Sequence, residues 1–247
     1  MTRQGSRVAI VTGGGSGIGR ATCRHLVAAG FRVGIIDLDA AAARDACGDG
    51  GIGIGADVSL AAPVERAVRA VEDALGPVDV LVNNAGIAGS AAATRLHETP
   101  VDEWDRVLAV NVRGPYLCTR AVLPSMLRRG DGHVITIASV AAIVPFAGRA
   151  AYSTSKGAAL QLARSIARDY GADGIRSNAV CPGMVETPMT RWRLDRPDLR
   201  AEIEQRIPLH RVAQPDDIAE AVTLLASGRM SYMNGSALVI DGGYTVV

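Results

Sequence analysis

Tyr152 and Lys156 lie four residues apart, a spacing that can support acid–base chemistry. Residues at positions i and i+4 share one face of a helix, so the two side chains would project together. A free tyrosine has a pKa of about 10, too high for an efficient base at neutral pH. An ammonium group ~4 Å away contributes roughly 4 kcal/mol at an effective dielectric constant of about 20, or about three pKa units. The pair therefore predicts a phenol whose pKa is brought near neutrality by its lysine.

Lys156 is also the only lysine in a chain whose lysines and arginines together number 26. Lysine carries a compact ammonium on a flexible stem, whereas arginine carries a bulky planar fork. A leftover surface lysine would explain an isolated position. The neighbouring Tyr152 instead favours a site that requires a point donor, which arginine would not replace.

A glycine-rich segment, TGGGSGIG at 12–19, lies between an expected strand and an expected helix. Glycines there permit a tight turn and close approach of the backbone to a pyrophosphate, and the helix N-terminus offers free N–H groups to that anion. Glycine-rich turns are common, but this position at the start of an α/β chain indicates a dinucleotide loop. The residues expected to contact the cofactor are Gly13, Ser16, Gly17, Ile18 and Gly19.

Asp37 ends the second expected strand, where a carboxylate can accept hydrogen bonds from a ribose diol and repel a 2′-phosphate. Its neighbour Leu38 and the loop residue Ser16 are neutral, which favours NAD over NADP. Arg20 and Arg24 on the first helix are a minor argument against this choice. An alternative is that Asp37 only caps the following helix.

Strands and helices alternate along the whole chain, and most of the strands lack polar alternation, which is typical of a parallel sheet covered on both faces. We therefore expect one doubly wound Rossmann-type α/β domain over 1–247, with about seven parallel strands. The segment 184–214 is rich in Arg, Pro and Met without clear periodicity and suggests a lid or substrate loop. The expected strands are 7–12, 32–37, 51–57, 78–82, 133–139, 176–181 and 236–240, and the expected helices are 17–29, 38–47, 60–75, 101–128, 151–170 and 216–226.

The motifs in combination resemble the short-chain dehydrogenase/reductase family over essentially the whole chain. The resemblance is carried by TGGGSGIG at 12–19, by NNAG at 83–86, and by Ser139 followed by Tyr152-x-x-x-Lys156. It implies that Tyr152 is the general acid/base and that Ser139 holds the substrate oxygen. It also implies that Lys156 hydrogen-bonds the nicotinamide ribose and that Asn111 holds a relay water.

Pro115 lies four residues after Asn111 inside the expected helix 101–128. Proline lacks the N–H that would bond the Asn111 carbonyl, so this carbonyl would be free to bind a water. Alternatively, Pro115 only marks a kink or loop. The remaining cofactor contacts rest on the resemblance, which implies Leu38, Asp57, Val58, Asn84, Ala85, Gly86, Pro182, Val185 and Thr187.

These features predict an NAD(H)-dependent oxidoreductase that interconverts a secondary alcohol and a ketone. One alternative is a 3-oxoacyl thioester reductase acting on carrier-protein or CoA substrates, suggested by the paired Arg128-Arg129. Another is a non-catalytic NAD sensor on the same fold. Arg191, Trp192, Arg193 and Arg196 would favour an acidic or conjugated substrate, beside an apolar wall at 140–148 and Met184.

The composition argues against several classes of binding partner. The net charge of +1 argues against nucleic acid, and no apolar run approaches the ~18 residues of a membrane span. The four cysteines and four histidines are scattered, which predicts a reducing, cytoplasmic setting and no metal site. The resemblance implies a homotetramer, with the helices at 101–128 and 151–170 forming one interface and the C-terminal IDGGYTVV contributing to another.

Overall fold

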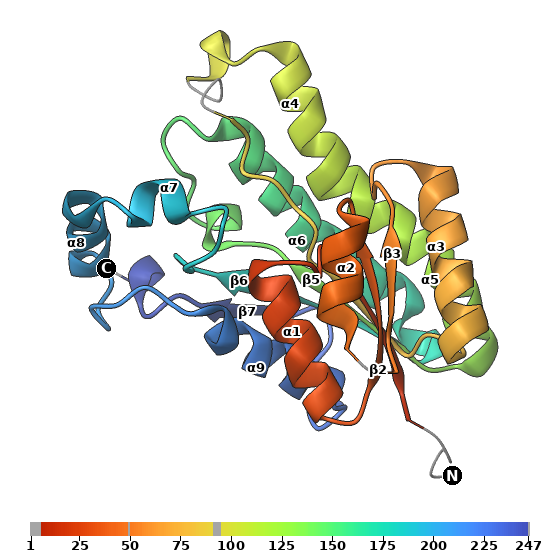
Figure 1. Ribbon diagram of the computed structural model, residues 1–247. Helices are drawn as coiled ribbons and strands as arrows, with labels where there is room; N and C mark the ends of the chain where they lie inside the picture. Colours follow the sequence, from red (N-terminus) through yellow and green to blue (C-terminus); the bar gives the residue numbers. More distant parts are fainter. Residues whose placement is uncertain (1–5, 49, 91–94, 247) are drawn as a thin grey trace.

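Seven parallel strands form one sheet in the computed structural model, which describes residues 6–48, 50–90 and 95–246 (Figure 1). The strand order is β3-β2-β1-β4-β5-β6-β7, so the expected doubly wound α/β fold is confirmed. The other residues of the expected domain 1–247, namely 1–5, 49, 91–94 and 247, lie outside the described residues. The strands are β1 Val8–Thr12, β2 Arg32–Asp37, β3 Ile52–Gly55, β4 Val80–Asn83, β5 Gly132–Ile137, β6 Ile175–Pro182 and β7 Ala237–Ile240.

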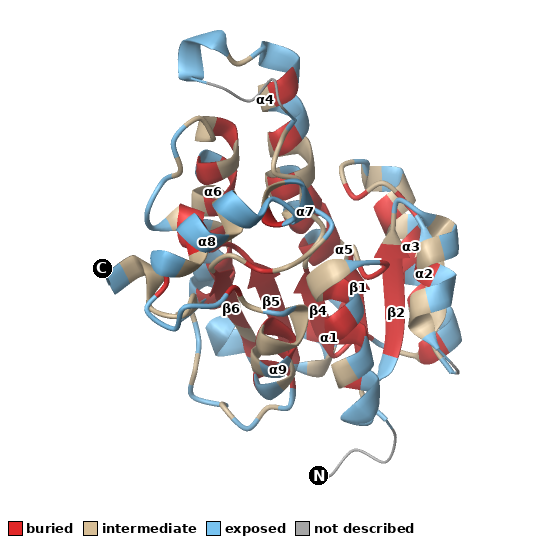
Figure 2. Ribbon diagram, turned by 60° about the vertical axis from the view of Figure 1, so that its left-hand side comes forward, coloured by how far each residue is buried: buried red, intermediate tan, exposed pale blue. Residues whose placement is uncertain are grey.

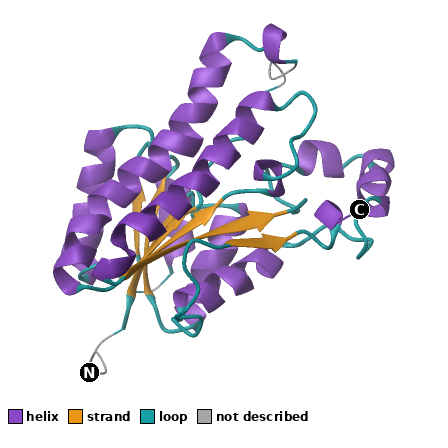
Figure 3. Cartoon of the chain, turned by 180° about the vertical axis from the view of Figure 1, so that it is seen from behind, coloured by secondary structure: helices purple, strands orange, loops and turns teal. Residues whose placement is uncertain are grey.

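Helices cover both faces of this sheet (Figure 3). They are α1 Gly17–Ala28, α2 Ala40–Cys47, α3 Ala61–Leu75, α4 Val101–Leu108, α5 Gly114–Arg129, α6 Ala150–Tyr170, α7 Arg191–Leu194, α8 Pro197–Gln205 and α9 Pro215–Ala226. Shorter helical turns are η1 Leu96–Glu98, the π-helix η2 Ala109–Arg113, η3 Val140–Ala142, η4 Gly171–Asp173 and η5 Tyr244–Val246.

The alternation of side chains along each strand divides the core into two layers. In β1, Val8 and Ile10 pack with α3 and α5, while Ala9 and Val11 pack with α1 and α9. Successive side chains of a strand point to opposite faces, so a strand covered on both faces must be apolar throughout. All five residues of β1 are accordingly buried, and Figure 2 shows the central strands as buried throughout.

The strand order reverses between β1 and β4, which are neighbours in the sheet although β2 and β3 lie between them in sequence. In open parallel sheets a crevice forms at such a point, outside the carboxyl ends of the strands. Thr12 ends β1 and Asn83 ends β4. The glycine-rich segment and the NNAG segment are therefore brought side by side.

Two parts of the chain differ from the expected elements. The helix expected at 101–128 is interrupted by the π-helix η2, so that α4 and α5 are separate elements. The segment 184–214 is not an irregular loop, because it contains α7 and α8. Its two ends meet at an isolated parallel β-bridge between Val185 and Ala213. Within the described residues, no helix is long and apolar enough to cross a membrane.

Candidate active site

A cleft of about 340 Å³ lies at the carboxyl ends of the strands, over the point where the strand order reverses. It gathers the glycine loop, the end of β2, the segment after β4 and the start of α6 in one place. Among the residues lining it are Gly13, Ser16, Gly17, Ile18, Asp37, Leu38, Asp57, Val58, Asn84, Ala85, Gly86, Ser139, Tyr152, Lys156, Pro182, Val185 and Thr187.

The glycine loop is fastened to the end of β4 by hydrogen bonds. The Asn84 side-chain amide donates to the carbonyl oxygens of Thr12 and Gly13, at 2.9 Å each. In return, the Thr12 hydroxyl accepts the backbone N–H groups of Asn84 and Ala85 at 3.0 Å. Buried backbone groups that are paired in this way fix the loop relative to the sheet. Thr12 is thus a positioning residue that the sequence motif contained but did not assign.

Two glycines of the loop are in close contact with neighbouring backbone. Gly13 has a φ of +64°, and a Cβ at this position would lie 2.8 Å from the Ala85 Cα. Gly19 lies outside the cleft lining, because it packs directly against the Gly13 carbonyl, which a Cβ would approach to 2.1 Å. Ser16 precedes α1 and its side chain makes no capping hydrogen bond. The hydroxyl and the N-terminal N–H groups of α1 therefore fit an anion such as a pyrophosphate.

Asp37 is held at the end of β2 by two backbone N–H groups. Its Oδ2 accepts the N–H of Gly15 at 2.9 Å, and its Oδ1 accepts the N–H of Asp39 at 3.0 Å. The cap of α2 is Asp39, whose side chain accepts the N–H groups of Ala41 and Ala42. The helix-capping role considered for Asp37 therefore belongs to Asp39. Asp37 presents a fixed carboxylate to the cleft.

The basic residues of α1 are already engaged with carboxylates. Arg20 lies 2.7 Å from the carboxylate of Asp45, and Arg24 pairs with Asp216. Exposed pairs of this kind contribute little to stability, but they do occupy the guanidinium groups. The two arginines counted against NAD selectivity thus have other partners than a cofactor phosphate.

Tyr152 lies in the first turn of α6 and lines the cleft together with Ser139. Burial raises the pKa of the Tyr152 phenol above its usual value, and a hydrogen bond with Ser139 acts in the opposite direction. The expected lowering of this pKa by Lys156 is therefore not seen in the protein alone. The physical reason is that removing water from a phenolate costs more free energy here than its neighbours return.

Lys156 is buried beneath Tyr152, with Nζ 5.8 Å from the centroid of the tyrosine ring. Nζ donates a 2.8 Å hydrogen bond to the carbonyl oxygen of Ile137 at the end of β5. Burial lowers the pKa of Lys156 to about 8, while the Cys181 thiol acts in the opposite direction. The ammonium form is therefore the main one at neutral pH, with further N–H donors available beside the one given to Ile137.

Asn111 is buried in η2 and does not line the cleft with its side chain. Its Nδ2 donates to the Ile87 carbonyl at 2.8 Å and to the Ser155 hydroxyl at 2.9 Å. Its Oδ1 accepts the Ile87 N–H at 2.8 Å. Pro115 lies at the start of α5 instead of inside one long helix, so η2 accommodates the residue that lacks an N–H.

The structure thus brings most of the expected site residues to one cleft and leaves Gly19 and the Asn111 side chain behind its wall. The sequence did not point to several further lining residues, which are apolar or belong to the segment after β6. Apolar side chains carry no chemical signature that separates a cleft wall from the core. These residues are Ile36, Ala56, Ile87, Val110, Ile137, Ala138, Gly183, Pro188, Met189 and Thr190.

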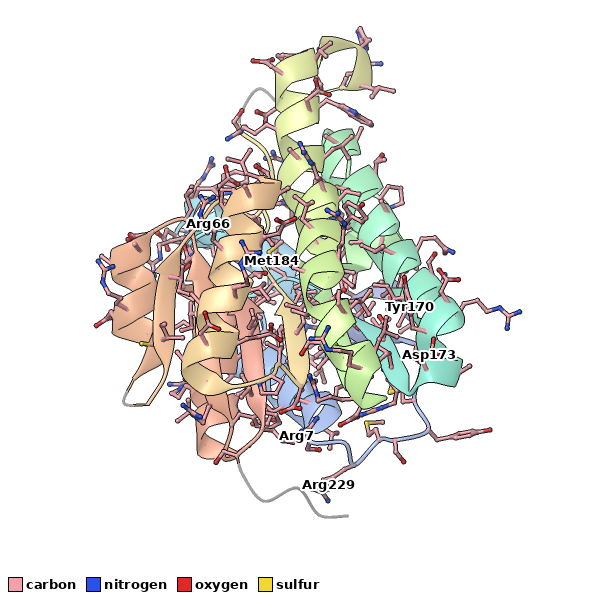
Figure 4. The ribbon with its side chains drawn as sticks, turned by 90° about the vertical axis from the view of Figure 1, so that its right-hand side faces the viewer. Arg7, Arg66, Tyr170, Asp173, Met184 and Arg229 are labelled. Atoms are coloured by element: carbon pink, nitrogen blue, oxygen red, sulfur yellow. The ribbon has the colours of Figure 1, made fainter. Side chains whose placement is uncertain are left out.

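The first residues of the segment 184–214 line the cleft, namely Val185, Thr187, Pro188, Met189 and Thr190. Gly17 and Thr187 approach one another there, since a Cβ on Gly17 would lie 3.2 Å from the Thr187 methyl group. The Arg149 guanidinium lies 5.8 Å from the centroid of the Trp192 ring of α7. Figure 4 labels Met184 near the middle of the molecule, above Arg7 and Arg229. Met184 packs against Leu194 and Ile203 of α7 and α8, and neither Met184 nor the segment 140–148, the expected apolar wall, is among the residues that line the cleft.

The chain matches the family model described as Enoyl-(Acyl carrier protein) reductase over residues 13–245. It is 50% identical to 2-(R)-hydroxypropyl-CoM dehydrogenase of Xanthobacter autotrophicus, over 98% of this chain and 100% of that protein. It is 36% identical to meso-2,3-butanediol dehydrogenase of Serratia marcescens, over 97% and 95% of the two chains. The crystal structure of levodione reductase superposes with a TM-score of 0.91 at 35% identity, covering 99% of this chain and all of the other.

Proposed function

The chain belongs to the short-chain dehydrogenase/reductase family, and from this we propose that it interconverts a secondary alcohol and a ketone with NAD(H). The observation that carries the proposal is the convergence of Ser139, Tyr152 and Lys156 on a cleft that also contains the glycine loop. A hydroxyl, a phenol and an ammonium in one partly closed site are suited to proton transfer at an oxygen atom.

The cofactor would lie along the carboxyl edge of the sheet. The N-terminus of α1 and Ser16 would hold the pyrophosphate, Asp37 the adenosine ribose, and Lys156 the nicotinamide ribose. The neighbouring residues Asp57 and Val58 would border the adenine, and Val185 and Thr187 the carboxamide. When bound, the nicotinamide supplies hydride transfer at the carbinol carbon.

Tyr152 would take the hydroxyl proton of an alcohol substrate and return it to the ketone oxygen in the reverse reaction. Ser139 would donate a hydrogen bond to the same oxygen and stabilise its developing charge. With the cofactor bound, the positive charges of Lys156 and of a cationic nicotinamide would together favour the phenolate. Their joint action would overcome the raised phenol pKa of the protein alone.

NAD(H) is the proposed cofactor in preference to NADP(H). Support comes from the Asp37 carboxylate, which two backbone N–H groups hold at the end of β2. A 2′-phosphate placed there would meet a fixed negative charge. The nearest arginines of α1 pair with carboxylates, which leaves this repulsion uncompensated.

For the substrate, we propose a small secondary alcohol that carries an anionic group. The half-identical relative is named for a coenzyme M conjugate, and such a conjugate carries a sulfonate. Arg191 and Arg193 bring positive charge to α7, beside Arg149 and Trp192. Guanidinium groups bind planar and tetrahedral oxyanions through several N–H donors at once.

The second candidate is a 3-oxoacyl thioester reductase. It shares an acyl-carrier-protein substrate with the description of the family model, but an enoyl reductase reduces a carbon–carbon double bond and not a ketone. The arginine pair that suggested it does not form one exposed patch. Arg129 donates hydrogen bonds to the Ser125 hydroxyl at 2.7 Å and to the Val78 carbonyl at 2.5 Å, while Arg128 is exposed. The pair is therefore not free as a whole to bind an acidic carrier protein.

A substrate panel measured by NADH absorbance tests the proposal. It contains a 2-hydroxypropyl thioether sulfonate, neutral 2,3-butanediol and a 3-hydroxyacyl thioester, each with NAD and with NADP. The proposal expects the highest kcat/KM for the sulfonate with NAD. Turnover of the thioester alone would favour the second candidate, and NADH binding without turnover of any compound would indicate an NAD sensor.

We also propose that the protein is a cytoplasmic homotetramer, in which α4, α5 and α6 form one interface and the C-terminal segment another. Large apolar side chains are exposed on these elements, including Val101 and Tyr116. The four free cysteines suit a reducing compartment. Light scattering at micromolar concentration should give about four times the chain mass of 25.6 kDa. A monomeric mass would contradict the assembly.

A further inference from the structure

Ser155 connects the two elements that carry Asn111 and Tyr152. It lies between Tyr152 and Lys156 in α6 and is completely buried. Its hydroxyl accepts a 2.9 Å hydrogen bond from the Asn111 Nδ2 and donates a 2.7 Å hydrogen bond to the Tyr152 carbonyl oxygen. One hydroxyl therefore bridges the π-helix η2 and the first turn of α6.

The π-helix η2 is hydrogen-bonded to the rest of the fold through Asn111. A π-turn is a rare local conformation, found mostly as a single turn within a helix. The Asn111 side chain is bonded to both backbone groups of Ile87 as well as to Ser155. Loss of the Ser155 hydroxyl would leave one N–H of the Asn111 amide without its partner in a buried place, which is unfavourable.

The Asn111 side chain also lies behind the wall of the cleft. Gly86 and Ile87 line the cleft, and a Cβ on Gly86 would lie 3.2 Å from the Asn111 Oδ1 and 3.5 Å from the Lys156 Nζ. The Asn111 amide and the Lys156 ammonium thus both lie next to Gly86. A shift of Asn111 would move Ile87, to which it is hydrogen-bonded, and with it this part of the cleft wall.

We propose that Ser155 is a positioning residue that couples the Asn111 π-turn to the Tyr152 and Lys156 turn of α6. The inference rests on the proposed oxidoreductase function. It predicts that the Ser155 hydroxyl affects the chemical step through Asn111, without itself touching substrate or cofactor. A serine that only stabilised α6 would change the melting temperature and leave the kinetics of the folded protein unaltered.

The test compares Ser155→Ala with Ser125→Ala, which removes another buried helix serine whose hydroxyl accepts a 2.7 Å hydrogen bond from Arg129. Since a displacement of about 1 Å can cost roughly 100-fold in rate, we expect kcat of Ser155→Ala to fall at least ~10-fold, with KM and the Kd of NADH changed less than ~3-fold. Ser125→Ala should keep kcat. Equal kcat values in the two variants would overturn the proposal.

A double-mutant cycle with Asn111→Ala locates the effect. If Ser155 acts through Asn111, adding Ser155→Ala to Asn111→Ala should lower kcat by less than ~2-fold, because coupled residues are not additive. Fully additive losses would overturn the coupling. If the wild-type protein turned over no alcohol, the proposed function would be wrong. The melting temperatures of the wild type, the two single variants and the double variant would then test whether Ser155 and Asn111 are coupled in the fold. Additive shifts in these temperatures would refute the coupling.

Discussion

The Lys156 Nζ lies 2.8 Å from the carbonyl oxygen of Ile137, at the end of the strand that leads into Ser139. This hydrogen bond holds the ammonium near the Tyr152 ring, at the wall of the cleft. The geometry depends on the small size of an ammonium group, since the side chain is almost completely buried. Replacing this ammonium by a larger cationic group therefore tests the role proposed for the only lysine in the chain.

We expect Lys156→Arg to lower kcat by roughly 100-fold or more while the fold survives. Arginine keeps the charge, but its planar fork cannot bond Ile137 and a ribose from the same compact position. Turnover with NAD and circular dichroism melting measure the two effects. Arg168→Lys, an exposed change on the same helix, serves as control and should keep full activity. Near-normal turnover of Lys156→Arg would show that no such geometric requirement exists.

Chemical modification gives a second check on the same lysine. Reductive methylation should alter only the N-terminus and Lys156, because no other amine is present. Bound NADH should protect Lys156 and leave the N-terminus reactive, as mass spectrometry of the two peptides would show. Equal modification with and without NADH would contradict a ribose contact.

Asp37→Asn should raise the affinity for NADP(H) by about tenfold or more, because it removes the repulsion between the carboxylate and the 2′-phosphate. Two like charges ~4 Å apart repel by about 4 kcal/mol at an effective dielectric constant of 20, and salt screens part of this energy. The amide keeps the size of the side chain, and its Oδ1 can still accept a backbone N–H. Fluorescence titration of NADPH and NADH measures the ratio. Asp73→Asn, the same change at an exposed position of α3 outside the cleft lining, should leave the ratio near that of the wild type. Tighter binding of NADPH than NADH by the wild type would refute the assignment.

Gly86→Ala should reduce kcat much more than it reduces stability. The added Cβ would lie 3.2 Å from the Asn111 Oδ1, closer than an ordinary contact, and in ordinary contact with the Lys156 Nζ at 3.5 Å. Gly171→Ala is a matched control, because its Cβ would lie at the same 3.2 Å from the Asn234 side-chain amide, away from the cleft. Similar kcat values for the two variants would argue that the contact at Gly86 has no catalytic consequence. Steady-state kinetics and thermal melting decide between these outcomes.

His133 should make the fold sensitive to mild acid. Burial lowers its pKa to about 3, with the nearby Arg176 acting in the same direction. Its Nδ1 bonds the Leu225 carbonyl, and its Nε2 accepts from the Asn178 amide at 3.0 Å. Because the folded pKa lies below the unfolded value of about 6.5, protonation favours the unfolded chain, and stability is lost as the pH falls below about 6.5.

Urea unfolding between pH 6.5 and 5 measures this loss, since most carboxylates titrate below that range. One histidine contributes at most about 1.4 kcal/mol per pH unit. His133→Gln should flatten the pH dependence, whereas His97→Gln, an exposed histidine, should not. Parallel curves for the wild type and His133→Gln would exclude His133 as the cause.

The strands and most helices were predictable because local apolar patterns determine them. The strand 32–37 was predicted with the bounds that the structure gives to β2, and the strand 51–57 is shortened to Ile52–Gly55. The missed helix α8 begins with Pro197, a common first helical residue that could have marked it. Its apolar Ile203 packs with Leu194 and Ile207 in a small separate cluster, too short for a periodic signal.

The residues that line the cleft were predictable where a residue type is itself informative, as for Asp37, Tyr152 and Lys156. The π-turn at Asn111 was not, because it depends on hydrogen bonds to Ile87, which lies 24 residues earlier in the chain. The same holds for Ser155, since serine is frequent in helices and only the fold brings its hydroxyl to Asn111. The raised phenol pKa of Tyr152 likewise follows from burial, which spacing alone does not reveal.

The bridge between Val185 and Ala213 has a consequence for how this enzyme can change its substrate. The Glu186 N–H bonds the Ala213 carbonyl at 2.8 Å, and the Ala213 N–H bonds the Met184 carbonyl at 2.9 Å, so the segment begins and ends at one point. A loop whose ends are already joined can vary in length at a small entropic cost. The segment between them can therefore be replaced as a unit, by recombination or by design, without altering the strands of the sheet.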